Sequence, residues 1–141
     1  MVYASWIRRF GGFLIDAVVA FLPSFAAGVY YETTVDSSGA PSTLGRTVDL
    51  IGIVVAAGVF VYLRWVRAGR TGQSLGRRIV NVRLVGEQSG QPIGVGRAAL
   101  RDVTHVVDTL AVGVGWLFPL WDRKHQTFAD KLGGTVVVRT P

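Results

Sequence analysis

The sequence predicts an α-helical polytopic membrane protein with a small β unit, and three observations support this fold class. Half of the residues are hydrophobic and only 17% are charged, which is too few charges to cover a soluble domain of this size. The apolar residues gather in three long segments, and the basic residues gather between them. Residues 79–85 alternate in polarity and residues 134–139 are β-branched, so both runs are expected to form strands that pair.

The first apolar segment, residues 10–31, contains one charged residue, Asp16. At about 1.5 Å of rise per residue, a helix of this length crosses about 30 Å of hydrocarbon. The alternative is a cleaved signal peptide, with a cleavage-like sequence at residues 24–26. Asp16 lies inside the apolar run and Pro23 lies close to the cut. Both disfavour cleavage, so we expect a retained helix that is kinked at the proline.

The second segment, residues 48–66, is also long enough to span. The third, residues 103–121, has sufficient length but is interrupted by Gly113, Gly115 and Pro119. Interrupted helices are tolerated at membrane depth only against protein or water. Three plain crossings remain one interpretation. The other is a third segment that breaks at the glycines and returns to the side it came from.

Charge distribution favours the second interpretation slightly. The loop of residues 32–47 has two acidic residues and one arginine, and Glu87 is the only acid among the arginines at positions 64, 67, 70, 77, 78, 83, 97 and 101. The positive-inside rule therefore places the N-terminus and segment 67–102 in the cytoplasm of a multi-pass plasma-membrane protein. The tail, residues 122–141, is also basic and carries the second expected strand. We therefore expect the tail on the same side, in one domain of residues 1–141.

Polar residues on the first helix form the first candidate site. Arg9, Gly12 and Asp16 fall at i, i+3 and i+7 and share one helix face. The two charges are about 10 Å apart along the axis, so each is expected to find a partner on another helix. An ionised aspartate inside hydrocarbon costs a few kcal/mol and needs a partner or a function. We therefore consider a buried ion pair that fixes packing and, as the alternative, an ion or proton pathway.

A second polar face is predicted in the third segment. Arg101, His105 and Asp108 fall at i, i+4 and i+7, again on one face. Because histidine titrates near neutral pH, a His105–Asp108 pair is suited to relay protons. A histidine that is hydrogen-bonded within a polar seam explains the pattern equally well. The sequence leaves both interpretations open.

Several classes of function are not supported by the sequence. There is no cysteine, and the two histidines do not have metal-ligand spacing, so we expect no metal and no cofactor. No triad or carboxylate pair can be identified, so we expect no enzyme. The basic, glycine-rich residues 69–78 lack the lysine and hydroxyl residue of a phosphate loop and are expected at lipid headgroups. The basic residues lie between apolar runs, which disfavours nucleic acid as a partner.

Four motifs in order resemble one family. They are residues 9–16, 71–78, 92–101 and 121–138, and together they resemble the RDD family of small membrane proteins, which is named for one arginine and two aspartates. The resemblance covers nearly the whole chain. It implies a membrane location. Transport, including cation/proton exchange, has been proposed for the family, so transport is one expectation.

The resemblance identifies Arg9 and Asp16 as the first two signature residues. The second aspartate often follows closely on the first, but Ala17 occupies the adjacent place here. Asp102, Asp108 and Asp130 are the candidates for it. For Asp130 we expect a structural role, either pairing with a basic residue of the tail (Arg123 or Lys131) or capping the turn before the last strand.

Two functions follow as expectations. The first is a small transporter or exchanger, in which Asp16 binds a cation or proton and Arg9 tunes its charge state. Three spans enclose too little interior for a path, so this function requires a homo-oligomer. The second is a non-catalytic accessory or assembly subunit of a larger membrane complex. In both, the lipid bilayer is the first partner.

Overall fold

A computed structural model describes residues 1–141. The elements in chain order are α1 (Trp6–Thr33), α2 (Thr43–Val61), the π-helical η1 (Tyr62–Arg67), α3 (Ala68–Thr71), α4 (Leu75–Ile79), β1 (Val82–Gly86), α5 (Val95–Leu110), α6 (Val114–Leu117), the 3₁₀ turn η2 (Phe118–Leu120), α7 (Phe128–Gly133) and β2 (Thr135–Arg139). They form two compact units. The polar unit comprises Met1–Asp16 and Leu63–Pro141, and the hairpin unit comprises Ala17–Tyr62.

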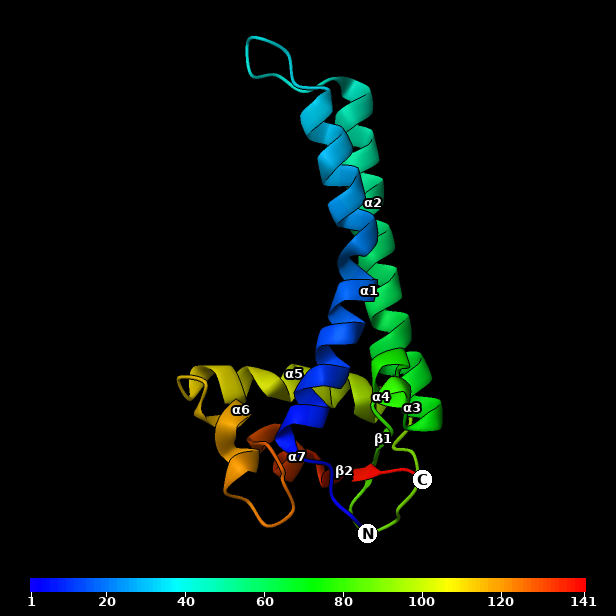
Figure 1. Cartoon of the computed structure of the whole chain (residues 1–141), viewed down its shortest axis with the longest axis vertical. Coiled ribbons are helices and arrows are strands. Elements are labelled where there is room, and N and C mark those ends of the chain that lie inside the picture. Colours follow the sequence, from blue (N-terminus) through cyan, green and yellow to red (C-terminus); the bar gives the residue numbers. More distant parts are fainter. The chain divides into compact units, whose positions relative to one another are not determined.

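The hairpin unit is an antiparallel pair made of α2 and the greater part of α1 (Figure 1). Small residues set the distance between the two helices. A Cβ atom on Gly52 would lie 2.3 Å from the Cβ of Ala27 and 3.0 Å from the carbonyl oxygen of Pro23. Only glycine fits such an approach, as is common where helices pack in membranes. Large apolar side chains of both helices, including Phe25 and Val54, remain exposed.

Two helical runs are long and apolar enough to cross a membrane, namely Trp6–Thr33 and Thr43–Thr71. They contain the predicted segments 10–31 and 48–66 but extend beyond both ends of each. The predicted boundaries were too narrow because they followed apolar composition, whereas the helical backbone continues through polar residues. At the start of the second run, for example, the Ser42 hydroxyl accepts a hydrogen bond from the backbone N–H of Gly45 and caps the helix.

The third predicted segment is broken. α5 and the run α6–η2 form a pair bent by 109°. The break is made by Val112 and Gly113, whose φ angles are 54° and 77°, so its predicted position at Gly113–Gly115 was slightly late. Residues 103–121 therefore do not form one straight helix. The helix also begins earlier than predicted, at Val95, where the chain leaves the positive-φ residue Gly94.

The predicted pairing of two strands is confirmed. β1 and β2 are antiparallel, with Val82 opposite Arg139 and Gly86 opposite Thr135. The first strand begins at residue 82 rather than 79. Residues 75–79 instead form α4, because the Ser74 hydroxyl caps this short helix. The buried core beside the sheet consists of Ala4, Val82, Leu84, Ile93, Ala98 and Val137.

The start of α1 is held very close to α4. A Cβ atom on Gly76 would lie 2.0 Å from the carbonyl oxygen of Gly12. We expect Gly76→Ala to lower the free energy of unfolding by about 1–3 kcal/mol, since backbone would have to move to relieve the overlap. The measurement is the thermal unfolding midpoint of the purified protein in detergent.

The matched control for this substitution is Gly96→Ala in α5, where a Cβ atom would meet nothing within 4 Å. This control is expected to be neutral or to stabilise the helix by up to about 1 kcal/mol. Equal midpoints for the two variants would contradict the close backbone contact.

Candidate functional site

Asp130 occupies the centre of a buried polar network in the polar unit, and its exposed fraction is 0%. It lies in the first turn of α7 and forms a capping box with Thr127, in which each side chain accepts from the other residue's backbone N–H. The same carboxylate accepts from the Arg101 guanidinium, with distances of 2.8 Å to Nε and 2.6 Å to Nη2, and from Arg9. Residues from three helices therefore meet on one carboxylate.

The predicted cap at Asp130 is confirmed, but the predicted pairing with Arg123 or Lys131 is wrong. Lys131 instead pairs with Asp122, at 2.7 Å. The basic tail residues are near in sequence, but the side chain of Asp130 points into the unit, toward arginines that are far away in sequence. Arg9 also donates to the carbonyl oxygen of His125.

Electrostatics hold the Asp130 carboxyl in its charged form. Burial by itself would raise its pKa, but the nearby guanidinium groups of Arg101 and Arg9 outweigh burial, so the net pKa lies below the usual range. The hydrogen bond from the backbone N–H of Thr127 acts in the same direction.

Arg64 and Asp102 form a second ion pair, which is largely buried. The guanidinium donates from Nε at 2.9 Å and from Nη2 at 2.7 Å, and the Trp65 indole donates to the same carboxylate at 3.2 Å. Arg101 lies between the two carboxylates, with Nη1 3.7 Å from Asp102. Arg64 was not among the predicted site residues, because the pairing joins residues that are 38 positions apart.

Asp16 has a different set of partners. Its carboxylate accepts from the Ser74 hydroxyl and, at 2.8 Å, from the backbone N–H of Gly76, and its exposed fraction is 2%. It thereby holds the N-terminus of α4 against α1, where Gly12 gives the space. The expectation that Arg9 and Asp16 find separate partners is confirmed.

The predicted polar face of α5 is buried as a unit, since Arg101, His105 and Asp108 all face inward. The Nδ1 atom of His105 lies 2.5 Å from the Asp108 carboxylate. The other oxygen of Asp108 accepts from the backbone N–H of Phe128 at 2.9 Å. His105 stacks on Trp116 with ring centroids 4.3 Å apart.

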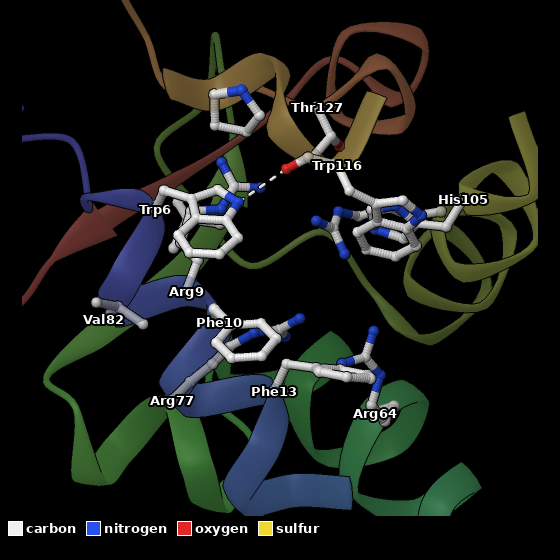
Figure 2. Close-up of a pocket in the computed structure, with 13 residues that line it drawn as sticks. Trp6, Arg9, Phe10, Phe13, Arg64, Arg77, Val82, His105, Trp116 and Thr127 are labelled. Carbon is white, nitrogen blue, oxygen red and sulfur yellow. Dashed lines mark hydrogen bonds between the residues drawn. The ribbon is translucent and has the colours of Figure 1, made fainter. Parts of the chain in front are cut away.

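A cavity of about 310 Å³ lies among these groups in the polar unit (Figure 2). Aromatic side chains form much of its wall, and the Trp6 indole donates to the carbonyl oxygen of Trp116 at 2.8 Å. Of the predicted site residues, Arg9, Arg101 and His105 line the cavity, whereas Gly12, Asp16 and Asp108 do not. The full lining is Trp6, Arg9, Phe10, Phe13, Arg64, Arg77, Val82, Arg101, His105, Trp116, Pro119, Thr127 and Val137.

Arg77 is another cavity residue that was not among the predicted site residues. Its exposed fraction is only 8%, and its Nη1 atom is buried without a hydrogen-bond partner. Burial, reinforced by the charges of Arg64 and Arg101, lowers its pKa to about 9. Its neighbour Arg78 is exposed. The two arginines lie on different faces of the short helix α4, and only the face of Arg77 is buried.

Two membrane-length apolar helices and an arginine-rich polar unit define a small helical protein of membrane type. The chain belongs to the RDD family, whose model matches residues 3–134. The suspected resemblance is therefore confirmed over nearly the whole chain.

Relatives with curated descriptions come from mycobacteria. The chain is 41% identical, over 70% of its length, to the proline-rich antigen homologs of two Mycobacterium tuberculosis strains, CDC 1551 / Oshkosh and H37Rv. It is 29% identical, over 95% of its length, to the proline-rich antigen of Mycobacterium leprae. These alignments cover 41% and 60% of the relatives, so the chain spans only part of their length. No solved structure matches the chain.

Asp130→Asn is expected to destabilise the protein by about 3–5 kcal/mol, because it leaves buried guanidinium groups without their carboxylate. The folded pKa of Asp130 is lowered. Its stabilising contribution is therefore complete above the unfolded value of about 3.9 and is lost as the pH falls toward the folded pKa. Thermal midpoints measured in detergent from pH 8 to pH 3 test this.

The matched control is Glu32→Gln, which removes an exposed carboxylate. We expect this variant to keep the wild-type profile, including the fall below about pH 4. An Asp130→Asn profile with the same acid limb as the wild type would contradict the assignment of that limb to Asp130.

Proposed function

We propose that the chain is a multi-pass integral protein of the plasma membrane, in which two bilayer crossings lie within the runs Trp6–Thr33 and Thr43–Thr71. Their length, their hydropathy and the exposed apolar side chains support this. An antiparallel pair of crossings returns the chain to the side it left. The polar unit is then on one side, and its excess of arginine over acidic residues supports the cytoplasmic side.

We further propose that the protein acts as a non-catalytic accessory or assembly subunit. The observation that carries this proposal is that the aspartates of its polar unit already accept hydrogen bonds from other groups of the protein. The carboxylates of Asp16, Asp102, Asp108 and Asp130 are all engaged by donors of the protein itself. A cation would have to displace these donors and reopen the packing of α1, α4, α5 and α7.

Transport of a small solute, or cation/proton exchange by an oligomer, is the second candidate function. One observation favours it. The His105–Asp108 pair lies at 2.5 Å, and its histidine faces the cavity beside Trp116. A histidine between a carboxylate and a cavity is placed to pass protons, although burial lowers the pKa of His105 to about 3 and keeps the ring neutral near pH 7.

Cysteine labelling tests the topology, because the chain contains no cysteine of its own. We expect Ser38→Cys, in the loop between α1 and α2, to react with a membrane-impermeant maleimide on intact cells. Ser89→Cys, which is exposed in the polar unit, is expected to react only after permeabilisation. The reverse pattern would overturn the orientation, and equal labelling of both would overturn the paired crossings.

Flux measurements separate the two functions. We expect liposomes that contain the purified wild type to show no more proton flux than protein-free liposomes under Na⁺, K⁺ or Li⁺ gradients. Asp16→Asn and His105→Gln are compared after circular dichroism has shown that they fold. Cation-coupled flux in the wild type that either variant abolishes would reject the accessory function and support exchange.

A further inference from the structure

The four arginines that line the cavity are not equivalent. Arg9 and Arg101 bind Asp130, and Arg64 binds Asp102. Arg77 takes part in no ion pair, and its buried Nη1 has no partner. The carboxylates that act on it through space are Asp102 and Asp16.

Both of those carboxylates are already occupied. Asp102 accepts from Arg64 and Trp65, and Asp16 accepts from Ser74 and Gly76. Neither is hydrogen-bonded to Arg77. A buried cation without a hydrogen-bonded counter-charge is unfavourable, and a guanidinium group presents donors in a fixed planar fork. The free donor of Arg77 therefore provides a place for an anion.

The aromatic walls of the cavity indicate that the anionic ligand also has an apolar part. Trp6 and Phe10 stack with ring centroids 5.2 Å apart, and Trp116 stacks on His105 on another wall (Figure 2). Phe13 lies under the Arg64 guanidinium at 5.4 Å. Apolar, aromatic walls strengthen a charge interaction beside them and favour a ligand with an apolar body. Inorganic ions alone would leave these walls without contacts.

We propose that this cavity binds a phosphate group carried on an apolar body, with Arg77 donating to the phosphate oxygens and Trp6 and Trp116 contacting the body. A guanidinium fork matches phosphate geometry. The choice of phosphate over carboxylate rests on the proposed membrane location, since every phospholipid headgroup carries a phosphate. The volume of about 310 Å³ fits a headgroup with the first part of its chains.

The test uses the full chain, purified in an uncharged detergent. The probes are dihexanoyl phosphatidic acid, inorganic phosphate and dihexanoylglycerol, which has the same body without the phosphate. Tryptophan fluorescence reports binding, because Trp6 and Trp116 line the cavity. The shift of the thermal midpoint gives a second readout that does not depend on fluorescence.

Arg77→Gln is compared with Arg78→Gln, its exposed neighbour on the same helix. We expect the wild type and Arg78→Gln to bind phosphatidic acid saturably, and Arg77→Gln to bind it about tenfold more weakly or worse. Arg77→Gln is expected to fold, because the substitution removes no hydrogen bond of the guanidinium group.

The pattern among the probes identifies the source of the phosphate. Binding of phosphatidic acid that millimolar inorganic phosphate does not displace supports a lipid headgroup. Binding of inorganic phosphate alone, lost in Arg77→Gln, would keep Arg77 as the phosphate ligand but would overturn the apolar body.

Two results would overturn the proposal. One is the absence of saturable binding of either phosphate probe to the wild type. The other is wild-type binding of dihexanoylglycerol with the same affinity as phosphatidic acid, which needs no variant to interpret. Failure here with successful cysteine labelling would reject the phosphate site and leave the membrane topology standing.

Discussion

The buried carboxylate of Asp130 is the constraint on which the polar unit depends. It joins the start of α1, through Arg9, to α5, through Arg101, and it caps α7 at the same time. A charge at 0% exposure is costly unless it is fully satisfied. The Asp130 carboxylate is satisfied only when Arg9, Arg101 and the N-terminus of α7 surround it in one arrangement. We expect the network to contribute mainly to the uniqueness of the packing.

A second consequence concerns the arginines themselves. Carboxylates compensate three of the guanidinium groups around the cavity, and the cavity wall leaves Arg77 without such a partner. The buried carboxylates are thus hydrogen-bonded within the protein, whereas the Nη1 donor of Arg77 has no partner. This asymmetry favours the proposed anion site over cation exchange.

Much of the fold follows from sequence pattern alone. Long apolar runs predict the two membrane-length helices, because about twenty consecutive apolar residues are the length that spans the hydrocarbon core as a helix. Glycines at 113 and 115 predict the break in the third segment, and alternation predicts the strand pair. The short helix α4 was missed, because five residues are too few for a periodic signal. Nothing in the surrounding sequence marks Ser74 as the residue that caps this helix.

The sequence by itself determined the family, the membrane-length helices and the inward face of α5 that carries Arg101, His105 and Asp108. Each of these is encoded by spacing within one segment. The tertiary structure decided which acid meets which base, since Arg9 reaches an aspartate 121 positions away. It also decided that Arg77, unlike Arg78, faces a cavity. Pairings between segments depend on packing in three dimensions, which local periodicity does not contain.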